Sequence, residues 1–159
     1  MEQQVEMYEE ELNQKKYGNI PLGVLGALIF SLGGVALYLI LYWANFIAWI
    51  SGFVMYTLAA LGYGLFTKTK DKPSFLNVLI PGIITVVMIL VSELLGLSII
   101  VHNELTAEYG NISFLETLSL IPYYLEDEAV LSAVLEDVGF MYLMGIISVI
   151  YTVRTRLKR

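Results

Sequence analysis

Residues 89–100, ILVSELLGLSII, form an apolar run that holds a single carboxylate, Glu93. A charge in water-free surroundings is costly, so an acid at membrane depth needs a hydrogen-bonding partner, a functional role or a position near the surface. The run belongs to a longer apolar segment, which makes it part of an expected membrane-spanning helix. Glu93 therefore bears on both the fold and the function of the chain.

The composition predicts an integral membrane protein. The chain has 159 residues, of which 57% are hydrophobic and 15% are charged. A soluble domain of this length needs a polar shell around a small core, and so few polar residues cannot build one. Because the chain has no cysteine, disulfides, thiolate metal ligands and thiol nucleophiles are excluded.

Four apolar segments set the expected architecture, at about 20–42, 44–66, 75–101 and 138–153. About 20 helical residues cross a bilayer core of about 30 Å, so the first three segments are long enough. The fourth is short, but LSAVLED precedes it and would extend the same helix outward. We predict an all-α fold, an integral membrane four-helix bundle that occupies residues 20–159.

Two segments are expected outside the membrane. Residues 1–19 carry apolar residues at helical spacing among acids, which predicts a short amphipathic cytoplasmic helix, with a frayed polar tail as the alternative. Residues 102–137 predict a partly helical outer cap, with a turn at EYGN and a capping box of Ser113 and Glu116. DEAVLSAVLED predicts a further helix. The cap is expected on the membrane surface or over the end of the bundle.

The charges indicate the orientation. Lys and Arg occur only in three clusters, at 15–16, 68–72 and 154–159, whereas eight of the fifteen acids lie in 104–137 with no base among them. Four crossings put the three basic clusters on one side, which the positive-inside rule assigns to the cytoplasm. Both termini are therefore expected in the cytoplasm, and the two tryptophans, Trp43 and Trp49, lie near the outer turn.

Small residues at four-residue steps predict where the helices pack, because membrane helices associate through close backbone approach. The expected packing residues are Gly23, Ala27, Ser31 and Gly34 in the first span, Ala48, Gly52, Ala60 and Gly64 in the second, and Gly96 in the third. The first two spans should form a tight antiparallel hairpin.

Glu93 lies about 7.5 Å outward of the expected midpoint of its helix, at 1.5 Å per residue. Tyr38 and Ser51 are the candidate partners at similar depth, and burial without a cation favours the neutral acid. Three interpretations stay open: a hydrogen bond between helices, a proton or cation site, and an incidental solvated position. Tyr38, Ser51 and Glu93 form the candidate ion or proton site of the second interpretation.

No catalytic motif is present. The chain lacks a Gly-rich phosphate loop, HExxH and GxSxG, so we predict a protein that is not an enzyme, with no metal site and no cofactor. His102 is explained as a histidine at the membrane interface, and the acids at 126–128 are explained as the start of a helix. The basic C-terminal tail is typical of a membrane anchor, and no nucleic-acid partner is predicted.

The Gly/Ala-rich hairpin ending in YGLF plus lysines, followed by GLSII, NEL and GNISFLETLSLIP, resembles small four-helix bacterial membrane proteins of uncharacterised families. The resemblance spans most of the chain and implies a bacterial inner (plasma) membrane, with no activity attached.

The expected function is that of a non-enzymatic multi-pass membrane protein, an interaction or accessory component of the membrane. Its expected partners are the lipid bilayer and either a second copy of the chain or another membrane protein. The alternative is a small oligomeric channel or transporter for protons or cations, in which Glu93 is the intramembrane ionisable site.

Overall fold

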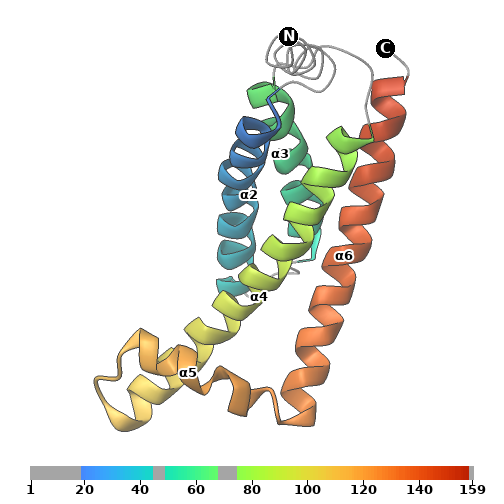
Figure 1. Ribbon diagram of the computed structural model, residues 1–159. Coiled ribbons are helices and arrows are strands. Elements are labelled where there is room, and N and C mark those ends of the chain that lie inside the picture. Colours follow the sequence, from blue (N-terminus) through green and yellow to red (C-terminus); the bar gives the residue numbers. More distant parts are fainter. Residues whose placement is uncertain (1–18, 45–48, 68–74, 158–159) are drawn as a thin grey trace, which may run out of the picture.

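The computed structural model describes residues 19–44, 49–67 and 75–157, and these contain helices and no strand (Figure 1). The helices are α2 (Ile20–Trp43), α3 (Ile50–Thr67), α4 (Leu76–Tyr109), α5 (Phe114–Tyr124) and α6 (Glu128–Leu157). Four of them, α2, α3, α4 and α6, are long and apolar enough to cross a membrane. The all-α class and the number of candidate spans are thus confirmed. The expected N-terminal amphipathic helix lies outside the described residues.

The helices differ in extent from the expected spans. Ala44 caps α2, with its N–H bonded to the Ile40 carbonyl, and α3 begins only at Ile50 instead of 44, because a helical chain cannot reverse direction across one residue. The helix α4 continues past 101 to Tyr109, and α6 begins at Glu128, ten residues before 138. Polar residues continue both helices beyond the apolar runs, and α4 extends until it meets a helix breaker. In α4 that breaker is Gly110, whose φ of +87° ends the helix at the expected EYGN turn.

The long helices α4 and α6 build a lobe at one end of the molecule. With 34 residues at about 1.5 Å each, α4 is about 51 Å long, well beyond an apolar core of about 30 Å. The short helix α5 packs against the far part of α4, and Figure 1 shows it at the end opposite to the start of α2 and the end of α6. The capping box at its start is present, since the Glu116 carboxylate accepts the Ser113 N–H.

The central helix of the packing is α3, which contacts α2, α4 and α6. The backbone of α3 approaches its neighbours most closely at glycines. A Cβ on Gly26 of α2 would lie 2.6 Å from the Gly62 carbonyl oxygen of α3, and a Cβ on Gly52 would overlap the backbone of Met141 in α6. Backbones therefore touch on two sides of α3, as membrane helices allow when a side chain is absent.

Seven of the nine expected packing residues are buried. Those that are buried are Gly23, Ala27, Ser31, Gly34, Gly52, Ala60 and Gly96. Gly64 is half-buried, and Ala48 lies outside the described residues. The pair Gly26 and Gly62 was not expected, because neither residue falls on the four-residue steps that the sequence suggested.

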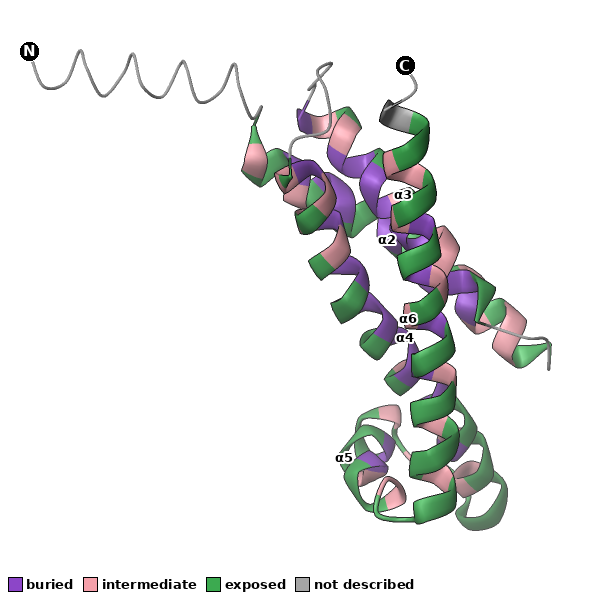
Figure 2. Cartoon of the chain, turned by 90° about the vertical axis from the view of Figure 1, so that its right-hand side faces the viewer, coloured by how far each residue is buried: buried purple, intermediate pink, exposed green. Residues whose placement is uncertain are grey.

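The faces that point away from the core are apolar. Large aliphatic side chains are exposed on all four long helices, among them Leu32, Leu65, Ile83 and Ile146. Figure 2 shows the buried residues gathered where the helices meet and the exposed ones along the outer sides, α6 above all. Exposed apolar area of this extent is typical of a surface that faces lipid or a partner rather than water.

Replacing Gly26 by alanine should lower the free energy of unfolding by about 1–3 kcal/mol, because the added methyl group overlaps the Gly62 carbonyl and forces α2 from α3. Unfolding by sodium dodecyl sulfate in mixed micelles measures this. The matched control is Gly139→Ala in α6, where a Cβ meets no atom within 4 Å. Its stability should stay unchanged or rise by up to about 1 kcal/mol. Equal losses in both variants would contradict the packing described for α2 and α3.

Candidate functional site

Glu93 of α4 is buried between helices and forms a hydrogen bond with Tyr38 of α2. The Tyr38 hydroxyl donates a hydrogen bond to Oε2 of Glu93, and the two residues are 0% and 3% exposed. This bond joins two helices at positions 55 residues apart in the sequence. Buried polar groups need such partners, since an unpaired carboxyl in an apolar interior costs several kcal/mol, on the order of 2–7.

Local sequence explains why the two side chains meet. Tyr38 continues the buried face of α2 that carries Ser31 and Val35, at helical spacing. On α4, Gly96 leaves the space that the tyrosine occupies: a Cβ there would lie 3.1 Å from Cε1 of Tyr38 and 3.3 Å from Cε1 of Tyr42. The rings of Tyr38 and Tyr42 stack on each other, with centroids 5.3 Å apart.

A second acid, Asp137 of α6, lies close to this cluster. It lies on a helix that packs against α4, and its side chain is half-buried. The sequence interpretation assigned Asp137 to the outer cap, whereas the continuous helix α6 carries it alongside the core. The helical spacing of Val134, Val138 and Met141 indicates that the helix continues through Asp137, and these three side chains pack into the core.

The acids Glu93 and Asp137 have no basic residue near them in the sequence, because no Lys or Arg occurs between 73 and 153. The cluster of Glu93, Tyr38 and Tyr42 therefore combines a carboxyl group with tyrosine hydroxyls and has no basic residue close to Glu93 in the sequence. Such a set can share or hold protons, and it offers hydrogen bonds without a compensating positive charge.

Ser51, the other expected partner, lies elsewhere in the packing. It is 0% exposed, and its Oγ lies 3.5 Å from Sδ of Met141 on α6. The sequence places Ser51 at a depth in the membrane similar to that of Glu93, but α3 is rotated so that the Ser51 side chain faces α6. Tyr38 is the expected partner that the structure brings to Glu93.

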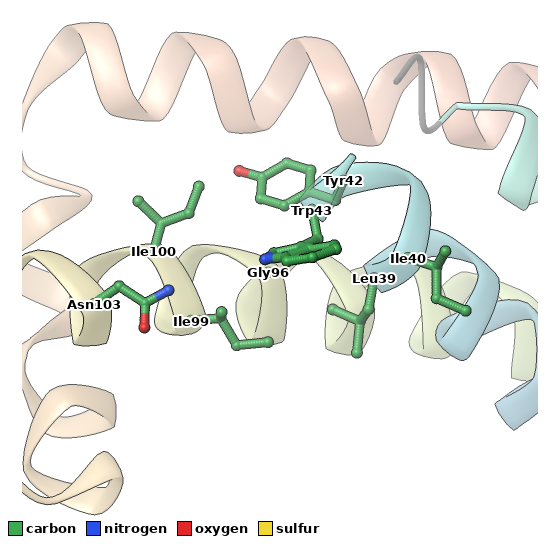
Figure 3. Close-up of a pocket in the computed structure, with 8 residues that line it drawn as sticks. All are labelled: Leu39, Ile40, Tyr42, Trp43, Gly96, Ile99, Ile100 and Asn103. Carbon is green, nitrogen blue, oxygen red and sulfur yellow. The ribbon is translucent and has the colours of Figure 1, made fainter. Parts of the chain in front are cut away.

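A groove of about 420 Å³ borders the cluster on the outside. It runs between the end of α2 and the C-terminal half of α4 and is lined by Leu39, Ile40, Tyr42, Trp43, Gly96, Ile99, Ile100 and Asn103. Figure 3 shows Asn103 at one end of the row, Leu39 and Ile40 at the other, and the Trp43 ring between them. A second groove, of about 360 Å³, lies between α4 and α6 and is nearly all apolar.

His102 joins α5 to α4. Its Nδ1 lies 3.1 Å from the Thr117 hydroxyl, and its ring meets Phe114 edge-on. In the acidic trio at 126–128, Asp127 accepts the Ala129 N–H at 2.8 Å and so caps the start of α6. Within the part of the chain that the structure describes, no three His, Cys, Asp or Glu residues are grouped to hold a metal ion.

Comparison with known proteins adds no family to this picture. No family model, curated protein or solved structure matches the chain. The resemblance to small four-helix bacterial membrane proteins stays a prediction, and function is argued from the geometry above.

The bond between Tyr38 and Glu93 should be measurable as a coupling energy. In a double-mutant cycle of Tyr38→Phe and Glu93→Met, we expect a coupling of about 0.6–1.7 kcal/mol in unfolding by sodium dodecyl sulfate, the range of hydrogen bonds between membrane helices. Tyr151→Phe, at an exposed tyrosine of α6, paired with Glu93→Met should give no coupling. Additive effects for Tyr38 and Glu93 would show that their bond contributes nothing to stability.

Proposed function

We propose that the chain is a multi-pass membrane protein with both ends in the cytoplasm, and that it acts as a non-enzymatic interaction or accessory component of a bacterial inner membrane. Four helices of sufficient length and apolar character, with exposed aliphatic side chains on their outer sides, support membrane insertion. The bilayer itself is then the first partner of the chain.

The distribution of charge supports the orientation. The lobe formed by the end of α4, by α5 and by the start of α6 carries exposed acids such as Glu104, Glu116 and Glu128. Arg154 stands at the other end, near the last turns of α6. Basic residues favour the cytoplasmic side, so the acidic lobe would face outward.

The observation that carries the accessory role is the environment of Glu93. The acid is bonded to Tyr38 within one chain, is 3% exposed, and lines neither of the two grooves described above. A conducting site needs contact with water or with a symmetry axis lined by charged groups. A buried, bonded acid is better suited to stabilise the contact between two helices, so the exposed apolar faces of the four long helices are the surfaces left for partners.

The transport alternative has one observation in its favour. Asp137 supplies a second carboxyl group close to Glu93, and it is only half-buried. Two acids and two tyrosines on adjacent helices could pass a proton from the outer surface inward. Such a chain would have to assemble into oligomers to complete a path.

The orientation can be tested with single cysteines, because the natural chain has none. In intact cells, a membrane-impermeant maleimide should label Ser119→Cys in α5 and leave Thr155→Cys near the end of α6 unlabelled; both positions are exposed. After the membrane is permeabilised, both variants should react. Labelling of Thr155→Cys alone in intact cells would invert the proposed orientation.

Flux measurements separate the accessory role from transport. Purified protein in proteoliposomes should carry no more proton or monovalent-cation flux than empty liposomes, because Glu93 is bonded inside the chain. Flux in the wild type that collapses in Glu93→Gln or Asp137→Asn, with folding retained, would replace the accessory role by transport. A matched substitution at the exposed lobe residue Glu116, Glu116→Gln, controls for lost surface charge.

A further inference from the structure

We propose that the groove between the end of α2 and the outer half of α4 binds one lipid of the outer leaflet, and that it prefers a headgroup ending in an ammonium group over an anionic headgroup. This inference rests on the membrane insertion proposed above, but it does not depend on the accessory role. The groove is the one lined by Tyr42 and Gly96, with a volume of about 420 Å³.

The inner part of the groove suits an acyl chain. Leu39, Ile40 and Ile99 line it with aliphatic side chains, and Gly96 lies in its lining together with Tyr42. Its volume lies in the range of pockets that hold small ligands, about 300–1,000 Å³. A flexible hydrocarbon chain fills such a space without demanding polar partners.

The outer part of the groove suits a headgroup. Asn103 stands at that end with an exposed side-chain amide, which can donate to a phosphate oxygen. Trp43, which is 83% exposed, lies across the middle of the groove (Figure 3). An indole sits favourably at the headgroup level, and its face attracts an ammonium group within about 6 Å. The polarity of the groove thus changes along its length as the polarity of a lipid does.

Charge complementarity determines which headgroup fits. Glu104 follows Asn103 directly, Glu108 lies one turn further, and both are exposed. They belong to the stretch 104–137, which has eight acids and no base. Within a Debye length of about 8–10 Å, these carboxylates repel an anionic headgroup and attract an ammonium group. A zwitterionic lipid with a terminal amine satisfies the amide, the indole and the acids together.

Trp43 can report the occupant of its own groove. The chain has two tryptophans, so Trp49→Phe leaves Trp43 as the single fluorophore. The full-length Trp49→Phe protein is reconstituted in equal amounts of phosphatidylethanolamine and phosphatidylglycerol. Bromine quenches indole fluorescence on contact and is placed on the chains of one lipid in one sample and of the other lipid in the second. The two bilayers have the same composition, so only the identity of the neighbouring lipid differs.

The expected result is stronger quenching when phosphatidylethanolamine carries the bromine, with a local preference of about twofold to fivefold, the effect of roughly one charge near a membrane surface. The preference should fall toward one in Glu104→Gln with Glu108→Gln, which changes only exposed side chains, and in Ile99→Phe, which fills the groove. The control is Trp43→Phe with Trp49 retained, which should report no preference.

Equal quenching by both lipids would overturn the proposal while leaving membrane insertion intact. The same preference in the Trp43→Phe control would also overturn it, because the enrichment would then surround the whole protein. Quenching by neither lipid would mean that Trp43 does not reach the bilayer, and membrane insertion itself would fail.

Discussion

The close approach of α3 to its neighbours is the constraint on which the rest of the structure depends. In the bilayer in which we propose that the chain lies, apolar side chains gain little from burial against one another, so contact area and close backbone approach would hold the helices together. Gly26 and Gly62 bring α2 to α3, and Gly52 brings α6 to another face of α3. The positions of Tyr38 on α2 and of Asp137 on α6 follow from these two contacts.

The hydrogen bond between Tyr38 and Glu93 contributes more to the specificity of helix packing than to the free energy of unfolding. An aliphatic face can slide along another by a residue or by a turn at small cost, whereas a buried carboxyl group has one arrangement in which it finds the tyrosine hydroxyl. Gly96 is part of the same arrangement, because its missing side chain admits both tyrosine rings. We infer that the bond fixes the register of α2 against α4.

The sequence alone was enough to predict the parts of this structure that depend on length and local chemistry. Apolar stretches of about 20 residues identify three of the long helices, a shorter apolar stretch identifies the fourth, and Ser113 with Glu116 identifies the start of α5. Depth along a helix can also be counted, which is why Tyr38 was a candidate partner of Glu93. Rotation about the helix axis cannot be counted in this way, so Ser51 was expected near Glu93 although it faces α6. The Gly26–Gly62 contact was missed because it depends on which helix faces meet. Asp137 was missed because α6 begins ten residues before the apolar run that predicted it.

The contacts of α3 have a further consequence for the cross-section of the molecule. The helices α2, α3, α6 and α4 follow one another around the perimeter, each packing against the next, and α3 also packs directly against α4. A square of four helices leaves room along its axis, but here one diagonal is shortened into a contact and the cross-section becomes a rhombus. Met55, Met88 and Met141 belong to the core of this arrangement. Among the described residues, methionine side chains thus occupy the region where α3 meets α4, and the exposed apolar faces lie on the outer sides of the helices.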